Sequence, residues 1–230
     1  MPLRSEFSQQ LETGLSQLGL TYEQAQVDRL LAYLQLLSKW NKVYNLTAIR
    51  DVNRMISHHL LDSLAILPAL HGERVVDVGA GAGLPGIPLA IMRRDCYFVE
   101  LESNHKKARF MRQVLMELAI KNTTVVCQRA EDYRGSKLAS PGFDTVLSRA
   151  FASLPEMLRV AGPLCTRQGI ILAMKGKIPK SELNSLPEGY ICDKVESLCI
   201  TGLEAERHLV HIKPHSEGAA TVSSEQCSIN

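Results

Sequence analysis

Residues 75–86 read Val-Val-Asp-Val-Gly-Ala-Gly-Ala-Gly-Leu-Pro-Gly. An apolar, β-branched stretch stops abruptly at a glycine-rich turn, and residues 87–92 (Ile-Pro-Leu-Ala-Ile-Met) then read as the opening of a helix. Glycines between a strand and a helix let backbone N–H groups approach a ligand closely. The stretch therefore predicts a nucleotide or nucleoside site at the end of a buried strand.

The bulk composition is that of an ordinary globular protein. The 230 residues are 45% hydrophobic and 22% charged, and the net charge of +2 neither requires nor excludes a nucleic-acid partner. No apolar run is long enough to span a bilayer, and residues 1–30 lack the apolar core of a signal peptide. The six cysteines are scattered without a Cys-x-x-Cys pair. We expect a cytoplasmic protein with reduced thiols and no membrane association.

Residues 1–70 are predicted to form a helical extension. Apolar residues follow helical spacing from Val27 to Trp40, and a second helical run covers Val52–Leu67. Thr21 and Gln24 have the spacing of a capping box before the first of these helices.

From residue 71 onward the pattern changes to alternating strands and helices, which predicts an α/β fold with a doubly wound, mainly parallel sheet over residues 71–213. The last two strands lack a convincing helix between them and are expected to be antiparallel neighbours. Residues 214–230 have no periodicity and are expected to be a disordered tail. The predicted strands are Arg74–Val78, Tyr97–Leu101, Thr123–Cys127, Thr145–Leu147, Gly169–Met174, Tyr190–Ser197 and His208–Lys213, with helices over Ser103–Ala119 and Leu154–Ala161.

Two frames of the glycine loop compete. Gly81-x-Gly83-x-x-Gly86 fits a dinucleotide fingerprint, but it starts two residues after the expected strand end at Val78. The frame Asp77-x-Gly79-x-Gly81-x-Gly83 starts inside the strand and suits an adenosyl-methionine moiety. Glu102 lies at the next strand-to-helix junction, about 20 residues past the loop, where an acid grips a ribose. Both ligands carry a ribose, so Glu102 does not separate the two frames.

Other polar residues have local interpretations. Arg149 follows a strand at the ligand edge, where it would contact an RNA phosphate, a cofactor carboxylate or a structural acid. Lys175 ends a strand at the same edge, where it would contact a phosphate. Arg207 is expected to contact RNA unless Glu204 or Glu206 holds it. A histidine–aspartate pair from the segment His58–Asp62 is expected to fix a helix end rather than to catalyse. His208 and His211 lie three apart on a strand and so face opposite sides, which rejects them as a metal pair.

Several long motifs together resemble one known family. They are Trp40-Asn41-Lys42-x-Tyr44-Asn45-Leu46-Thr47, His59-x-Leu61-Asp62-Ser63, the loop from Asp77 to Leu89, Ser148-Arg149-Ala150-Phe151-Ala152, Ala173-Met174-Lys175-Gly176 and Glu206-Arg207-His208-Leu209-Val210. Over nearly all of residues 30–213 the chain is similar to the small-subunit rRNA guanine-N7 methyltransferases once named glucose-inhibited division protein B. The chain departs from the family pattern at Glu102, often Asp there, and at Met174, often Leu.

The resemblance implies a class I methyltransferase fold, S-adenosylmethionine as methyl donor, and N7 of a guanine in the decoding region of 16S rRNA as acceptor. Small ribosomal subunits would be the partner, with no obligate protein partner. Guanine N7 carries an exposed lone pair, so direct in-line transfer needs alignment and neither an acid, a base nor a metal ion. The residues expected to bind the cofactor are Asp77, Gly79, Gly81, Gly83, Leu84, Glu102, Ala130, Glu131 and Arg149; Lys175 and Arg207 are expected to contact RNA.

Two other functions remain open from the residues alone. A nicotinamide-dependent dehydrogenase would use the first glycine frame, but it needs a catalytic acid or a Tyr-Lys pair that the sequence does not place. A non-catalytic RNA-binding protein would be free to lose the loop glycines, and all of them are present.

Overall fold

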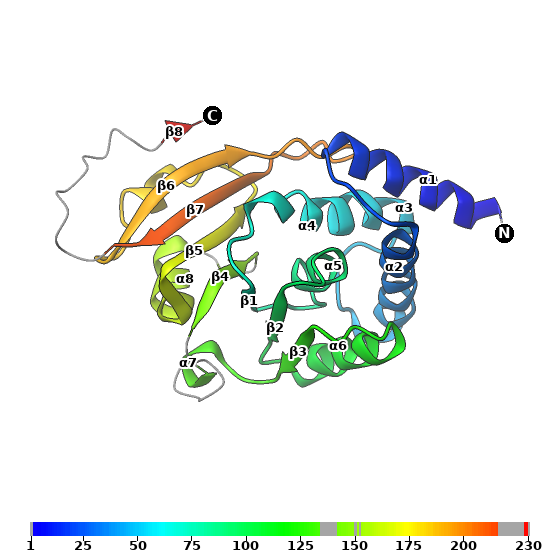
Figure 1. The fold of residues 1–230 in the computed structure, drawn as a ribbon, viewed down its shortest axis with the longest axis horizontal. Helices are drawn as coiled ribbons and strands as arrows, with labels where there is room; N and C mark the ends of the chain where they lie inside the picture. The colour runs from blue at the N-terminus through cyan, green and yellow to red at the C-terminus, as the bar shows by residue number, and fades with distance from the viewer. Residues whose placement is uncertain (1, 134–141, 150, 152, 216–227, 230) are drawn as a thin grey trace.

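A mixed sheet of eight strands runs through the molecule, with the order β3-β2-β1-β4-β5-β7-β6-β8 (Figure 1). The computed structural model describes residues 2–133, 142–149, 151, 153–215 and 228–229. The first five strands in this order are parallel, and β7 is antiparallel to both β5 and β6. The strands are β1 (Arg74–Val78), β2 (Tyr97–Leu101), β3 (Thr123–Val126), β4 (Phe143–Ser148), β5 (Cys165–Lys175), β6 (Tyr190–Ser197), β7 (His208–Pro214) and β8 (Ser228–Ile229).

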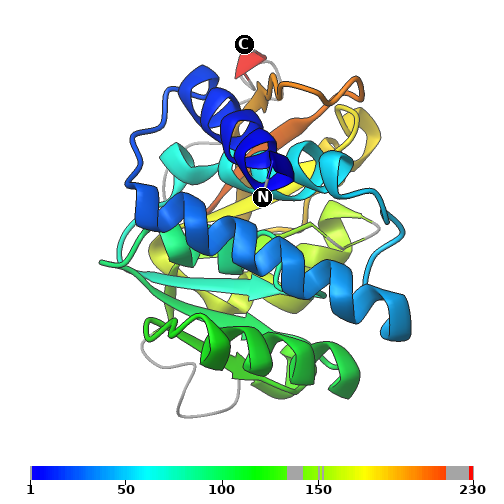
Figure 2. The same cartoon turned by 90° about the vertical axis from the view of Figure 1, so that its right-hand side faces the viewer.

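Helices cover both faces of the sheet (Figures 1 and 2). They are α1 (Pro2–Gln17), α2 (Gln24–Tyr44), α3 (Val52–Met55), α4 (Asp62–Leu64), α5 (Gly86–Met92), α6 (His105–Glu117), α7 (Ala130–Tyr133), α8 (Leu154–Ala161) and α9 (Lys180–Leu183), with short 3-10 turns at Leu67–Ala69 and Gly162–Leu164. The expected α/β fold and its antiparallel last pair of strands are confirmed. Because the strand order reverses between β1 and β4, the site is expected where these two strands end.

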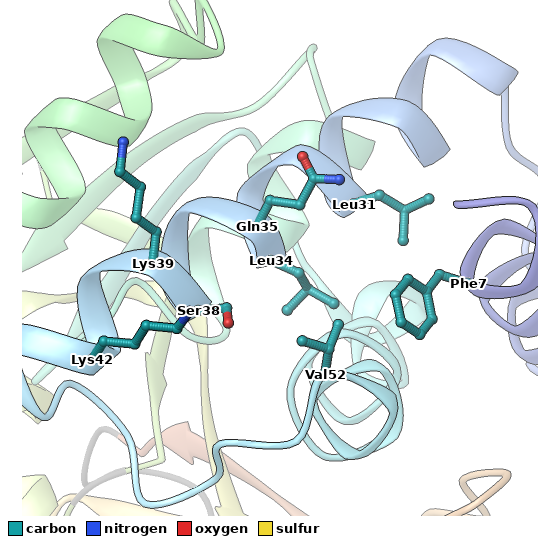
Figure 3. A pocket seen from close by; sticks show the side chains of 8 residues that line it. All are labelled: Phe7, Leu31, Leu34, Gln35, Ser38, Lys39, Lys42 and Val52. Atoms are coloured by element: carbon teal, nitrogen blue, oxygen red, sulfur yellow. The ribbon is translucent and has the colours of Figure 1, made fainter. Parts of the chain in front are cut away.

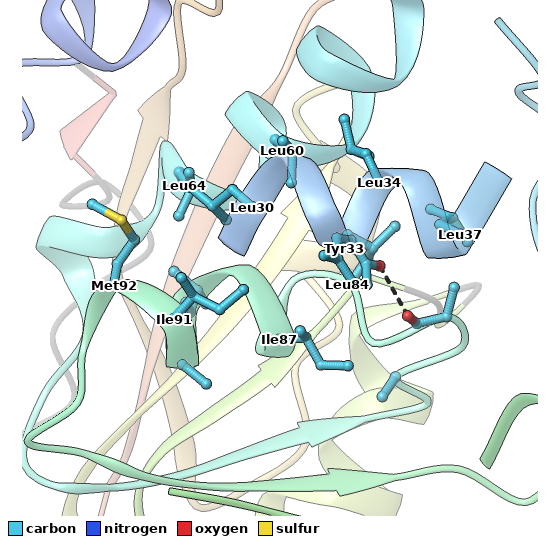
Figure 4. Close-up of a cluster of buried hydrophobic side chains, with 14 of the residues drawn as sticks. Leu30, Tyr33, Leu34, Leu37, Leu60, Leu64, Leu84, Ile87, Ile91 and Met92 are labelled. Atoms are coloured by element: carbon cyan, nitrogen blue, oxygen red, sulfur yellow. Dashed lines mark hydrogen bonds between the residues drawn. The ribbon is translucent and has the colours of Figure 1, made fainter. Parts of the chain in front are cut away.

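The helices that precede β1 share one core with the sheet. Leu30, Leu34 and Leu37 of α2 are fully or almost fully buried, and they belong to the same cluster as Ile87 and Ile91 of α5 (Figure 4). This burial follows from the helical spacing of the leucines, which places them on one face of α2. A second cluster lies among β4, β5 and α8.

The helical run predicted over Val52–Leu67 is confirmed as far as Leu64, and its middle turn, Ile56–Leu61, is a π-helix. The capping box predicted before α2 was wrong. The box that caps α2 is formed by Glu23 and Gln26, where the Glu23 N–H donates to Oε1 of Gln26 at 2.8 Å. The helix therefore starts later than the spacing of Thr21 and Gln24 suggested.

The expected tail lies mostly outside the described residues. Its described part shows Ser228–Ile229 as β8, parallel to β6. Among the described residues, no helix combines the length and apolarity that crossing a membrane requires.

Candidate functional site

The glycine loop after β1 is held against the end of β2. Gly79, Gly81 and Gly83 all have positive φ, at 75°, 61° and 84°, a region that only glycine adopts without strain. The N–H of Gly79 donates to the carbonyl of Leu101 at 2.8 Å, and the N–H of Gly81 donates to Oε2 of Glu102 at 2.8 Å. The alternating left-handed positions match the frame that begins at Asp77.

Gly86 is required for a different reason. It starts α5 without a positive φ, and a Cβ placed there would overlap the carboxylate of Glu100. Its N–H donates to Oδ2 of Asp77 at 2.9 Å. Asp77 is 1% exposed and does not line the cavity beside the loop that is described next. The structure thus places Asp77 beneath the loop as its support, and burial raises the pKa of its carboxyl to about 7.

A cavity of about 250 Å³ lies beside the loop at the ends of β1, β2 and β3. Of the predicted cofactor residues, Gly79, Glu102, Ala130 and Glu131 line it. The residues that sequence reasoning missed are Ser103, Gln128, Arg129, Phe151, Glu156 and Val160. Phe151 stands in a motif that resembles the family, which was the one available clue to it.

The residues around this cavity fit an adenosyl group. Each oxygen of the Glu102 carboxylate accepts one backbone N–H, from Gly81 and from Asn104, both at 2.8 Å. A carboxylate has about four acceptor positions, so capacity remains for a pair of ribose hydroxyls. A Cβ on Gly81 would meet only the carbonyl of Gly79, at 3.9 Å, so the space over the loop is open.

Besides Asp77, four predicted cofactor residues do not line this cavity: Gly81, Gly83, Leu84 and Arg149. Leu84 is 4% exposed and belongs to the core cluster (Figure 4). Arg149 lines a second cavity of about 370 Å³, together with His58, His59, Asp62 and Lys175 and with Ile49, Met174, Gly176 and Arg207. Arg149, which follows β4 directly, thus lines the second cavity, whereas Phe151, two residues further on, lines the first.

Asp62 organises the second cavity. Its Oδ2 lies 3.2 Å from Nη1 of Arg149, and its Oδ1 lies 3.0 Å from Nε of Arg207. The predicted histidine–aspartate pair is therefore wrong, because Asp62 meets two arginines that are distant in the chain. The alternative that the carboxylate of Glu204 or Glu206 holds Arg207 is also wrong: Arg207 donates to Asp62, and of Glu206 it meets the backbone carbonyl, at 2.9 Å.

His59 is held neutral at the wall of this cavity. Its Nδ1 lies 3.0 Å from the carbonyl of His58, so Nδ1 carries the proton, and its Nε2 lies 2.9 Å from the hydroxyl of Thr47. Burial and, to a smaller extent, the nearby charge of Arg149 lower the pKa of His59 to about 4. Asn41 in turn orders the loop that carries Thr47, through a 2.9 Å bond from the N–H of Thr47 to its Oδ1.

Lys175 lies in the same cavity and pairs with Glu182 at 2.9 Å. The same carboxylate oxygen accepts the N–H of Leu154 at the start of α8. The three cations of this cavity, Arg149, Lys175 and Arg207, thus face two carboxylates. Within the described part of the chain, no group of three or more His, Cys, Asp or Glu side chains is placed to hold a metal ion.

Replacing Asp62 with alanine is expected to lower the melting temperature and to release Arg149 and Arg207 from their positions in the second cavity. Asp62 has a 3% exposed side chain, so its loss leaves Arg149 and Arg207 without their counter-charge, at a cost of roughly 1–3 kcal/mol since both arginines are about a quarter exposed. The matched control is Asp95→Ala, which removes the exposed Arg93–Asp95 pair and should cost under about 1 kcal/mol. Equal shifts of melting temperature in the two variants would contradict the assigned role of Asp62.

Tyr33 connects the helical extension to the glycine loop. Its hydroxyl, fully buried, donates to the carbonyl of Ala82 at 2.9 Å (Figure 4). Tyr33→Phe leaves that carbonyl unsatisfied, so we expect a loss of about 1–3 kcal/mol in stability and a several-fold weaker cofactor affinity, measured by calorimetry. Tyr97→Phe, which removes an exposed bond to Thr124, is the control expected to change neither. Unchanged cofactor affinity in Tyr33→Phe would show that the loop does not depend on this bond.

Comparison with known proteins agrees with this geometry. A putative O-methyltransferase structure from Klebsiella pneumoniae superimposes with a TM-score of 0.54 at 15% identity, covering 80% of this chain and 90% of that one. The sheet order and the loop thus define a class I methyltransferase fold. The model of the family rRNA small subunit methyltransferase G matches residues 26–210. The chain belongs to this family.

Two relatives show how far the similarity extends. The ribosomal RNA small subunit methyltransferase G of Nitrosococcus oceani is 51% identical over 208 residues, which cover 90% of this chain and 95% of that protein. The protein of the same name from Methylococcus capsulatus is 49% identical over 204 residues, covering 89% of this chain and 97% of its own.

Proposed function

We propose that this protein transfers a methyl group from S-adenosylmethionine to N7 of a guanine in the decoding region of 16S rRNA. The observation that carries the proposal is a pair of cavities that residues following β4 both line: one lies beside the glycine loop, and the other is lined by cations. Membership in the rRNA small subunit methyltransferase G family supports the reaction and the RNA class. Small ribosomal subunits in the cytoplasm are the proposed partner.

The first cavity is the proposed donor site. Gly79 and Gly81 keep the backbone free of side chains, whereas Gly83 leaves room for the side chain of Ile87. Glu102 would accept the ribose hydroxyls, and Ala130 with Glu131 would lie beside the adenine. S-adenosylmethionine supplies a methyl group on a positively charged sulfur, ready for an electron-pair donor. Asp77, beneath the loop, would keep the position of Gly86 rather than contact the ligand.

The second cavity is the proposed acceptor site. Arg149, Lys175 and Arg207 exceed their two partner carboxylates by one positive charge, which suits an RNA phosphate. Both ring nitrogens of His59 are engaged, and its low pKa keeps it uncharged near neutral pH. A guanine N7 needs no proton removed before it accepts a methyl group, so the residues of this cavity need only to hold the base in place.

The direct test is to incubate the protein with radiolabelled S-adenosylmethionine and small ribosomal subunits from a strain that lacks the enzyme. We expect label on a single 16S guanine, cleavable by N7-specific chemistry, and no label on subunits from a strain that has the enzyme. Naked 16S rRNA in parallel distinguishes the assembled particle from free RNA as substrate. Measurable cofactor binding without label on either RNA would overturn the acceptor assignment.

Lys175→Ala is expected to weaken RNA binding several-fold and to leave cofactor affinity unchanged. Loss of one phosphate contact should also lower the slope of log affinity against log salt by about one. Lys213→Ala, which breaks the half-exposed pair with Asp193 at 3.0 Å, is the matched control. Equal losses of RNA and cofactor affinity would mean that Lys175 does not act through RNA.

A further inference from the structure

A third cavity, which is also lined by cations, lies at the opposite edge of the sheet, where α5 and α6 end and β3 begins. It has a volume of about 410 Å³, an apolar floor of Ala90, Ile91 and Ile120, and a rim of Arg29, Arg94 and Lys121. The rim residues come from three separate segments: α2, the turn after α5 and the turn before β3. Helices α2 and α6 contact each other and lie side by side in Figure 2.

These cations are not needed to cap α5. The carbonyls at the end of this helix are already satisfied by two neutral amides: Asn122 Nδ2 donates to Ala90 and Arg93 at 3.1 and 3.0 Å, and Gln26 Nε2 donates to Met92 at 3.1 Å. Side-chain cations commonly serve this purpose at a helix end. Since neutral donors occupy the carbonyls here, capping does not account for the rim cations.

The rim cations also lack effective counter-charges. Arg94 pairs with Glu23 at 3.7 Å, and both side chains are at least half exposed, so this pair contributes little. Within the described ranges, Arg29 and Lys121 have neither an ion pair nor a side-chain hydrogen bond, and Arg29 is partly buried. Three like charges around one cavity repel one another, and a bound anion would relieve this repulsion.

We propose that this cavity binds a phosphate group, carried either by an RNA backbone or by a nucleotide. Two guanidinium groups and one ammonium group are the side chains best suited to a phosphate, since each guanidinium can donate two parallel hydrogen bonds. The apolar floor leaves room beside the phosphate for the rest of the ligand. The site is separate from the cavity of Arg149, Lys175 and Arg207, and only its RNA source depends on the proposed rRNA substrate.

The test compares the full chain with a double variant, Arg29→Gln and Lys121→Gln, which removes the two unpaired cations. Calorimetry with pyrophosphate and with ADP at low salt should show a binding event in the wild type that weakens at least tenfold in the variant, whereas any binding at the cavity of Arg149, Lys175 and Arg207 should be unchanged. A control carrying Lys194→Gln and Lys213→Gln loses the same charge from paired positions and should bind like the wild type. The affinity for S-adenosylmethionine should be equal in all three proteins, which also verifies that they are folded.

Filter binding of 16S rRNA and of small subunits across salt concentrations distinguishes the two sources. If RNA carries the phosphate, the double variant loses RNA affinity and its salt slope falls by about two. If only ADP and pyrophosphate binding falls, the source is a nucleotide. The proposal would be overturned if the double variant and the control bound every probe with the same affinity. Arg29→Gln alone provides the same comparison should the double variant fail to fold.

Discussion

Gly81→Val is expected to weaken the binding of S-adenosylmethionine by at least ~100-fold, which corresponds to about 2.7 kcal/mol. The φ of 61° costs a β-branched residue roughly 1–2 kcal/mol or more in strain. A Cβ at this position meets no protein atom nearer than the Gly79 carbonyl at 3.9 Å, so the valine would occupy the open space over the loop. The cofactor therefore loses the close backbone approach that the loop provides.

The control for this variant is Gly19→Val. Gly19 has nearly the same φ, 68°, and a Cβ there meets nothing within 4 Å, but it lies in the turn between α1 and α2. The two variants should lose similar stability by thermal unfolding, while only Gly81→Val loses cofactor affinity by calorimetry. Cofactor affinity that is equal in the two variants would remove Gly81 from the donor site.

Glu100→Gln is expected to stabilise the protein at pH 8 and to flatten its pH dependence. Glu100 is opposite Asp77 in the register of β1 and β2, and both carboxyl groups are buried. Neither oxygen of Glu100 has a hydrogen-bond partner among the described residues. Burial, and then the neighbouring Asp77, raises the pKa of Glu100 well above its usual range, and burial raises the pKa of Asp77 to about 7.

The sign of the pH dependence follows from these raised pKa values. Because the folded protein binds protons that the unfolded chain releases above about pH 4, the stabilisation is fully present below that pH and is lost as the pH rises through 7. For Asp77 the loss has an upper limit of roughly 4 kcal/mol. A glutamine removes one titrating group, and its amide is able to donate to the Asp77 carboxylate, which lowers the pKa of Asp77.

The measurement is the free energy of unfolding from pH 5 to 8, for the wild type, for Glu100→Gln and for Glu188→Gln. Glu188 is an exposed glutamate, so this control should follow the wild-type curve. We expect the wild type to lose stability across this range and Glu100→Gln to lose less. A slope that Glu100→Gln leaves unchanged would show that the buried pair does not carry the pH dependence.

Features that depend on neighbours in the chain were predictable from the sequence. The buried strand ending at Val78, the glycines after it and the leucine-bearing face of α2 each follow from a local repeat or from a local backbone requirement. The alternation of strands and helices then restricts the sheet to a doubly wound arrangement, because parallel strands need right-handed crossovers. The edge that carries the ligand follows from this topology.

Features that depend on contacts between distant segments were not predictable. Asp62 was expected to pair with a neighbouring histidine, yet it meets Arg149 and Arg207, 87 and 145 residues further on. The burial of the Leu84 side chain in the core cluster was also not indicated by its position in the loop, and its expected contact with the cofactor stays a prediction. The spacing of residues in the sequence indicates which side chains are neighbours on one helix. It does not indicate which side chains from other segments pack against them.

The sequence by itself determined the fold class, the position of the glycine loop and the acid at the end of the second strand, because each depends on residues that are adjacent or periodic in the chain. Only the tertiary structure decided which charges meet. It set Asp77 against Glu100 beneath the loop and Asp62 between two arginines, and among the residues that the structure describes it gave Arg29 and Lys121 no counter-charge. The reason is physical: electrostatic interactions and burial depend on distance in space, and the packing of the whole chain fixes that distance.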